Sequence, residues 1–219
     1  MSRLALCFAG LPRITTVSSA SWQRLMDQHH TDVFVHAWSA DMEQTRNCIA
    51  AAYAPRCMVI ESQRAFDTSI YTSRIWAYRS EPRNVLSMWY SIGQSLQLAD
   101  AYAQQHHVHY DYVARARFDW HCDQFVLEPF DGLTVPDDLG LSGHHFQRRG
   151  LWHVAHNDQF GYGSMMVMRD YGETFSRIPW LYTVDQVDFC SELLLTANML
   201  SKQIPVKLQK GMRYRMVRE

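Results

Sequence analysis

Residues 110–123, YDYVARARFDWHCD, combine a β-rich run with charged side chains at every second position. Successive side chains of a β-strand point to opposite faces of its sheet. A strand that continues through this stretch would therefore place four polar side chains on one face, namely Arg115, Arg117, Asp119 and His121. Because charged groups are costly to bury without partners, the pattern favours a strand end that faces an anionic ligand and a divalent metal ion.

The residue types on this face suit a metal-bound phosphate ligand. Asp119 and His121 form an Asp-x-His pair, and its oxygen and nitrogen ligands suit Mn²⁺, or less well Mg²⁺. Arg115 and Arg117 carry the side chain that grips phosphate oxygens in a bidentate way. The same spacing also fits an ordinary exposed salt bridge between Arg117 and Asp119, which would contribute little to stability.

The N-terminal part of the chain alternates predicted strands and helices. Apolar runs predict strands over residues 3–9, 31–38 and 56–60. Helices are expected from a cap at Ser18 or Ser19 to about residue 29, and over residues 42–53. This order is typical of a parallel sheet with crossover helices. With a further strand at residues 112–118, we expect an α/β fold with a mostly parallel central sheet and a few antiparallel strands.

Two further segments bring polar residues to the carboxyl edge of this sheet, where α/β proteins bind ligands. The loop after the first strand contains Gly10, which permits close backbone approach, and Arg13, which either meets a phosphate or faces solvent. Pro82 precedes a helix whose apolar residues recur at the spacing of a core-facing stripe. Asn84 and Ser87, near the start of this helix, are expected at the ligand edge.

The C-terminal half contributes two candidate carboxylates. Asp158 precedes a predicted apolar strand at residues 165–168, where it is either a substrate-binding carboxylate or a plain turn residue. A short helix is expected near residues 170–177. Ser191 is predicted to cap a later helix whose first turn contains Glu192, a position that the helix dipole alone would explain.

The composition is that of one globular domain over residues 1–219. Hydrophobic residues make up 47% of the chain, and the formal net charge of −1 gives no basic excess for nucleic-acid binding. Five scattered cysteines without a Cys-x-x-Cys pair favour reduced thiols. No apolar run approaches the roughly 20 residues of a membrane span, and the run at residues 4–9 is too short for a signal-peptide core. We therefore expect a cytoplasmic protein without a membrane span.

An ordered set of short motifs runs through about residues 1–200. It comprises a Gly-x-x-Arg loop after the first strand, the strand DVFVHAW, the helix segment NVLSMWYS, the strand VARARFD and the later DQFGYGS. This set resembles small glycosyltransferases of the GT-A fold from bacteria and their viruses. The resemblance implies an α/β/α sandwich and a nucleoside-diphosphate-sugar donor, most simply a UDP-hexose such as UDP-glucose. It also implies a glycan or lipid-linked saccharide as the acceptor.

The resemblance assigns roles to the residues that match its motifs. Enzymes of this kind hold a divalent metal, and through it the donor diphosphate, on an Asp-x-Asp motif. Asp119 matches the first position and His121 replaces the last, which implies Mn²⁺ or Mg²⁺ at this pair. The resemblance also places four residues beside the nucleotide, the phosphates or the donor sugar: Gly10, Arg13, Arg115 and Arg117.

The mechanism and two competing functions stay open at this point. An inverting transferase needs a general base, for which Asp158 is the first choice and Glu192 the second, whereas a retaining enzyme can use the leaving phosphate. The first competing function is a non-catalytic nucleotide-sugar-binding protein, which the His121 departure and the small size of the chain leave open. The second is a metallohydrolase built on histidine clusters such as His153 and His156, which would need a converging carboxylate.

Overall fold

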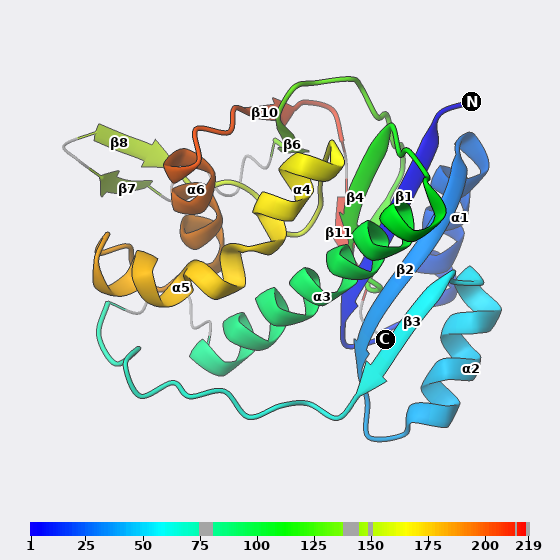
Figure 1. The fold of residues 1–219 in the computed structure, drawn as a ribbon, viewed down its shortest axis with the longest axis horizontal. Coiled ribbons are helices and arrows are strands. Elements are labelled where there is room, and N and C mark those ends of the chain that lie inside the picture. Colours follow the sequence, from blue (N-terminus) through cyan, green and yellow to red (C-terminus); the bar gives the residue numbers. More distant parts are fainter. Residues whose placement is uncertain (75–80, 138–144, 149–150, 213, 218–219) are drawn as a thin grey trace.

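A computed structural model describes residues 1–74, 81–137, 145–148, 151–212 and 214–217, with the backbone alone for 145–148 and 151–154. Its centre is a seven-stranded sheet in the order β10-β6-β9-β4-β1-β2-β3 (Figure 1). Neighbouring strands pair in parallel except at β9, which is antiparallel to β4 and β6. The strands are β1 (Arg3–Gly10), β2 (His30–Trp38), β3 (Cys57–Glu61), β4 (Tyr112–Ala116), β6 (Leu133–Pro136), β9 (Gly161–Gly163) and β10 (Val206–Gln209). The predicted mostly parallel sheet is confirmed.

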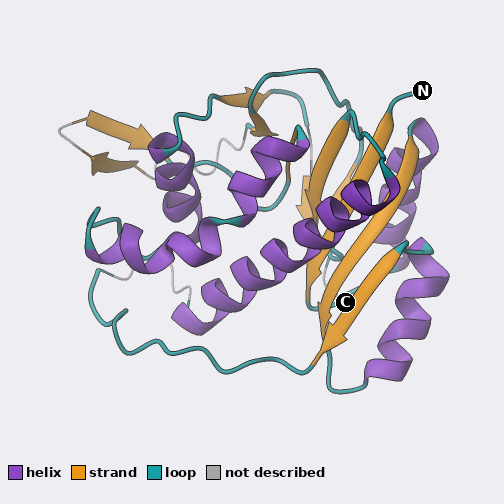
Figure 2. Ribbon diagram, in the orientation of Figure 1, coloured by secondary structure: helices purple, strands orange, loops and turns teal. Residues whose placement is uncertain are grey.

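Helices cover both faces of this sheet and complete an α/β/α sandwich (Figure 2). One face packs against α1 (Thr16–Gln28) and α2 (Met42–Tyr53), and the other against α3 (Pro82–His106), α4 (Met165–Gly172), α5 (Thr174–Thr183) and α6 (Ser191–Ser201). The alternation of β1 explains the division. Leu4, Leu6 and Phe8 join the core beside α1 and α2, whereas Ala5 and Cys7 join the core beside α3.

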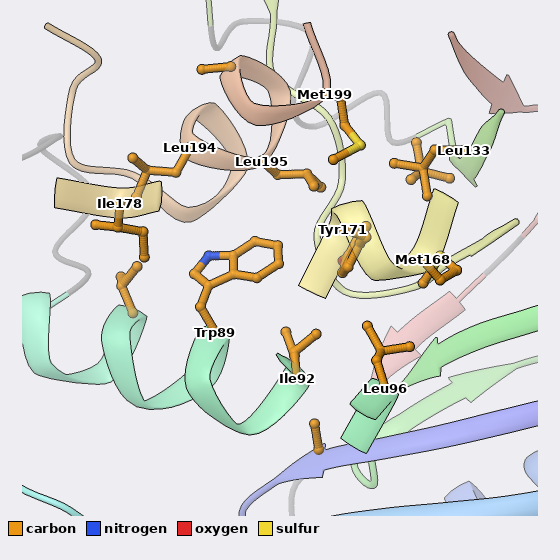
Figure 3. Packing of buried hydrophobic residues seen from close by; sticks show 14 of the residues in the cluster. Trp89, Ile92, Leu96, Leu133, Met168, Tyr171, Ile178, Leu194, Leu195 and Met199 are labelled. Carbon is orange, nitrogen blue, oxygen red and sulfur yellow. The ribbon is translucent and has the colours of Figure 1, made fainter. Parts of the chain in front are cut away.

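The larger core joins α3 to the three C-terminal helices. Trp89, Ile92 and Leu96 are buried at helical spacing on α3, as the sequence predicts. They project toward the buried side chains of α4, α5 and α6, among them Tyr171 and Leu195 (Figure 3). This packing holds α3 between the sheet and the C-terminal helices, and so fixes the position of its first turn.

Two helix starts differ from the sequence-based expectation. α1 begins after Thr15, whose side chain accepts a hydrogen bond from the Ser18 amide, while the Ser18 hydroxyl accepts one from the Thr15 amide. This capping box replaces the predicted cap at Ser18 or Ser19. The cap of α6 is Cys190, without a side-chain hydrogen bond, and the predicted cap Ser191 is the first residue of the helix and donates its hydroxyl hydrogen bond to Asp158.

The apolar residues 165–168 begin α4, so the strand predicted there is wrong. Ser164 caps the helix by accepting a hydrogen bond from the Val167 amide. The strand of this region is β9, which ends just before that cap. The short helix predicted near residues 170–177 is confirmed as helical structure, but it is divided between the end of α4 at Gly172 and the start of α5 at Thr174.

The strand predicted at residues 112–118 ends two residues early, and the continuation toward His121 does not occur. β4 ends at Ala116, a turn follows, and β5 (Trp120–Cys122) leaves the central sheet to pair antiparallel with β11 (Tyr214–Met216). Two long-range contacts fix this turn. The Trp22 indole donates a hydrogen bond to the Arg117 carbonyl at 2.9 Å, and Trp120 stacks on Phe160 in the core beside α1. The alternation of side chains between the two faces of the sheet therefore holds as far as Arg115, but the predicted continuation to His121 is wrong.

Three further features complete the described part of the chain. β7 (His145–Arg148) and β8 (Leu151–Val154) form a separate antiparallel pair. All five cysteines are described, and each is a free thiol. The described helices include none with the length and apolar character needed to cross a membrane.

Candidate functional site

A cavity of about 290 Å³ opens where β1, β2 and β4 end, beside the start of α3. Seven of the residues predicted from the sequence line it: Gly10, Arg13, Asn84, Ser87, Arg115, Arg117 and Asp119. They belong to three segments that are far apart in the chain. The parallel topology brings these segments to one edge of the sheet, which is where α/β folds bind ligands.

The loop after β1 begins at Gly10, whose φ of +104° favours glycine. A Cβ at this position would meet no heavy atom within 4 Å, so the backbone conformation, and not a lack of space, requires the glycine. The Arg13 amide donates to the Leu11 carbonyl at 2.9 Å and tightens the turn that follows. Half of the Arg13 side chain stays exposed at the mouth of the cavity, where a ligand can reach it.

Arg115 lies on the face of β4 that packs toward α3, and only 1% of it is exposed. Its Nε and Nη1 atoms have no hydrogen-bond partner among the described residues. Burial lowers the pKa of this guanidinium, and the nearby Tyr171, Asp158 and Asp119 oppose that effect. A buried cation with unsatisfied donors is costly unless a partner arrives, which points to an anionic ligand.

Arg117 and Asp119 form a bidentate ion pair at the cavity wall. The Nε and Nη2 atoms of Arg117 donate to Oδ1 and Oδ2 of Asp119, both at 2.8 Å. Nη1 of Arg13 lies 3.9 Å from the same carboxylate. Burial alone would raise the pKa of Asp119, but the hydrogen bonds and charge of Arg117, with help from Arg13, hold that pKa below its usual value. The predicted salt bridge therefore exists, and it lies within the cavity.

The first two turns of α3 supply the polar rim of the cavity. Asn84 is exposed there, and the buried hydroxyl of Ser87 accepts a hydrogen bond from Nε2 of Gln63 at 3.3 Å. Pro82 occupies the start of this helix, and the cap residue Glu81 makes no side-chain cap. The positive end of the helix dipole favours an anion in this place.

Trp38 is a lining residue that the sequence reasoning missed. It ends β2, is 2% exposed and stacks on Tyr90 of α3 with ring centroids 5.5 Å apart. Its indole N–H has no hydrogen-bond partner among the residues that the structure describes. The rule that ligands bind at the carboxyl ends of parallel strands indicated Gly10 and Arg115. The same rule applies to Trp38, because Trp38 ends a parallel strand at the same edge.

The two candidate bases, Asp158 and Glu192, do not line the cavity. Asp158 is 6% exposed, and its carboxylate accepts a hydrogen bond from the Ser191 hydroxyl. That hydroxyl in turn accepts one from the Trp89 indole at 3.0 Å. The charge of Asp158 acts on both neighbouring arginines of β4 and its turn. Glu192 follows Ser191 in α6 and accepts a hydrogen bond from the Cys190 thiol at 2.8 Å.

His121 also lies outside the cavity lining, apart from its predicted partner Asp119. Its Nδ1 lies 3.3 Å from the Val17 carbonyl oxygen, and its Nε2 lies 3.0 Å from the Asp123 carboxylate. Among the described residues, no group of three or more His, Cys, Asp and Glu side chains could hold a metal ion. Asp119 and His121 thus have separate partners, which a shared metal ion would have to displace.

The histidine-centred alternative gains no support from the described residues. The side chain of His153 lies outside them, so its predicted pairing with His156 has no geometry to report. Among the described residues, no histidine belongs to a group of three or more His, Cys, Asp and Glu side chains that could hold a metal ion. The only histidine that is fully buried in this part of the chain is His36, and it bonds to Ser91 and Glu61.

The fold and the site define an α/β/α protein with a cationic cavity at the carboxyl edge of a mostly parallel sheet. No protein-family model matches the chain, and no curated protein matches it. The function proposed below therefore depends on the residues of the cavity and on the motifs of the sequence.

Proposed function

We propose that this protein is a glycosyltransferase that takes a hexose from a nucleoside-diphosphate sugar, with UDP-glucose as the first donor to test. The observation that carries the proposal is the gathering of Arg13, Arg115 and Arg117 in one cavity at the carboxyl edge of the sheet. Guanidinium groups bind phosphate oxygens in a bidentate way. The proposed acceptor is a glycan or lipid-linked saccharide, and the proposed location is the cytoplasm.

The proposed transfer exchanges one bond at C1 of the hexose. The bond from C1 to the diphosphate oxygen breaks, its electron pair stays on the leaving nucleoside diphosphate, and a new bond forms from C1 to an acceptor hydroxyl oxygen. The hydroxyl proton passes to a carboxylate in an inverting enzyme, or to the leaving phosphate in a retaining one. Negative charge grows on the diphosphate during this step, and preorganised cationic groups stabilise it. The three arginines are the groups proposed for this role.

Asp158 is the first candidate for a general base, and Glu192 is the second. The charge of Asp158 acts on Arg115 and Arg117, which supports a position near the reacting groups. An acceptor hydroxyl would have to share or displace the hydrogen bond from Ser191 to reach this carboxylate. A positioned base of this kind contributes about 10²–10⁴-fold to the rate of such reactions.

Mn²⁺, or Mg²⁺, at Asp119 and His121 stays a prediction from the sequence. A divalent metal, when bound, neutralises charge on a leaving phosphate. In the structure the two side chains have separate partners, Arg117 for Asp119 and Asp123 for His121.

A second candidate function is a non-catalytic protein that binds nucleotide sugars. One observation favours it: among the described residues, the carboxylate of Asp119 is the only one on the cavity wall, and Arg117 holds both of its oxygens. Such a protein would bind the donor without breaking it.

The experiment that separates the two candidates is turnover of UDP-, GDP-, CDP- and dTDP-sugars, followed by NMR detection of the released nucleoside diphosphate. A transferase should slowly hydrolyse at least one donor, and Asp158→Asn should lower that rate by about 10²–10⁴-fold while the donor still binds. The control is Asp100→Asn, which removes a partly buried carboxylate that is paired with Arg169 away from the cavity and should leave the rate unchanged. Binding of a donor without any release would contradict the transferase and support the non-catalytic protein.

A further inference from the structure

We propose that the cavity holds the diphosphate of its ligand with arginine side chains alone, so that binding needs no divalent metal ion. This inference rests on the proposed function, because it states how the same cavity holds the donor. Its support comes from the charges on the cavity wall, from the contacts of Asp119 and from the unsatisfied donors of Arg115.

The charges on the cavity wall favour an anion and disfavour a cation. Among the described residues that line the cavity, Arg13, Arg115 and Arg117 carry guanidinium groups and Asp119 alone carries a carboxylate. The charge of Asp158, outside the lining, offsets part of this positive excess, and the charge that is left matches the negative phosphates of a nucleotide sugar. The excess positive charge of this wall would repel a divalent cation at short range, because the protein screens charge less than water does.

The carboxylate expected to hold the metal serves instead to orient an arginine. Both oxygens of Asp119 accept hydrogen bonds from Arg117 at 2.8 Å, and Arg13 lies within 3.9 Å. A metal ion at Asp119 would compete with both guanidinium groups. The second expected ligand, His121, is held by the Val17 carbonyl and by Asp123. The pair therefore lacks the arrangement that a shared metal ion needs.

The bond to Asp119 leaves a suitable edge of Arg117 for the ligand. A guanidinium group held through Nε and Nη2 still has the edge formed by Nη1 and Nη2, which can bind two phosphate oxygens. Asp119 thus fixes the plane of the guanidinium without using all of its donors. The contact with Arg117 explains why a carboxylate, that of Asp119, is present in a site that binds an anion.

Arg115 points to an anion independently of the Arg117–Asp119 pair. It is 1% exposed, lines the cavity, and has no hydrogen-bond partner for Nε or Nη1 among the described residues. Satisfying buried donors of a cation is favourable, and phosphate oxygens are strong acceptors for them. A metal ion offers no acceptor and would repel the same group.

The test is calorimetric titration of the full chain with UDP and with inorganic pyrophosphate, in EDTA and in Mn²⁺. We expect binding in EDTA, with an affinity within about threefold of that in Mn²⁺. Arg117→Ala should weaken binding in EDTA by roughly tenfold or more. The matched control is Arg169→Ala, because Arg169 forms the same kind of bidentate pair with Asp100, away from this cavity. Arg117→Lys keeps the charge without the fork and should bind more weakly than the wild type.

The possible outcomes separate this inference from the proposed function. Binding that appears only with Mn²⁺ and disappears in Asp119→Asn would overturn the inference and leave nucleotide binding in place. Absence of binding in both buffers would overturn the proposed function and the inference with it. Circular dichroism of each variant shows whether it folds, and an Arg117→Lys variant that folds but binds as well as the wild type would also contradict the bidentate role.

Discussion

Arg115 is a buried cation whose Nε and Nη1 lack hydrogen-bond partners among the described residues. A buried charge without full pairing lowers the stability of a fold. Proteins retain such costly groups where function requires them, and replacing them often improves stability while activity is lost. We therefore assign Arg115 to ligand binding and not to support of the sheet.

Arg115→Met tests this assignment, because methionine fills a similar volume without a charge. We expect pyrophosphate binding to weaken by roughly tenfold or more, since a charge-assisted hydrogen bond is lost. The melting temperature should stay the same or rise, since the buried charge is removed. Calorimetry measures the first quantity and thermal unfolding the second. A fall of several degrees in the melting temperature would show that the arginine supports the fold.

Gly10→Ala tests the loop that carries Arg13. The φ of +104° at Gly10 makes alanine unfavourable by about 1–2 kcal/mol in the free energy of unfolding. Gly211 has a φ of +82° and equally open surroundings, so Gly211→Ala is a matched control. Urea unfolding should show a similar loss in both variants, while only Gly10→Ala weakens nucleotide binding. Equal binding by the two variants would separate this loop from the site.

A helix or strand could be predicted accurately where a short stretch of sequence determines it. β1 and α3 were predictable because an apolar run and a helical stripe are both local patterns. Residues 165–168 form a short apolar run, and periodicity alone does not decide whether such a run is a helix or a strand. Ser164, as a helix cap, is the only local sign of α4. The end of β4 at Ala116 depends on Trp22 and Phe160, which are distant in sequence, so no local pattern indicates it.

A buried histidine joins β2, β3 and α3 beside the cavity. Nδ1 of His36 lies 2.8 Å from the Ser91 hydroxyl of α3, and its Nε2 lies 2.9 Å from the Glu61 carboxylate of β3. Burial lowers the pKa of His36, although Glu61 acts to raise it. The folded protein therefore disfavours the protonated imidazole, and the unfolded chain binds the proton more readily.

Stability should consequently fall as the pH drops below the usual histidine pKa of about 6.5. Above that pH, His36 makes its full contribution to the free energy of unfolding. This contribution is lost as the pH falls toward the lowered pKa of His36 in the fold, and the free energy then changes by at most about 1.4 kcal/mol per pH unit. Urea unfolding from about pH 8 to about pH 5, for the wild type and His36→Gln, measures this effect. The stability gap between them should narrow toward acid. A widening gap would mean that His36 gains a proton in the fold and pairs with Glu61.

The two edges of the central sheet differ in how their charges are paired. At the amino edge the buried Asp32 accepts hydrogen bonds from Arg3, from the Tyr110 hydroxyl and from Arg56, which ties together the starts of neighbouring strands. At the carboxyl edge, Arg13, Arg115 and Arg117 instead line an open cavity, where Asp119 is the only carboxylate among the described lining residues. The charges at the amino edge therefore support the fold, whereas the cavity at the carboxyl edge leaves its arginines accessible to a ligand.

The common direction of the parallel strands explains which site residues could be predicted from the sequence. Parallel strands end at one edge, so residues near strand ends, such as Gly10 and Arg117, could be assigned to the cavity before the fold was known. Asp158 and His121 lie outside its lining because packing of α6 and β5 determines their positions. Those contacts join distant segments, and a single sequence does not contain them.

The most direct measurement is calorimetric titration of UDP-, GDP-, CDP- and dTDP-sugars into the wild type, Arg13→Ala and Arg169→Ala. The arginine-lined cavity predicts that at least one nucleotide sugar binds the wild type, since guanidinium groups bind phosphate strongly. The affinity should fall by roughly tenfold or more in Arg13→Ala and stay unchanged in Arg169→Ala. No binding by any of the four, or equal affinity in both variants, would contradict a nucleotide-sugar site at this edge of the sheet.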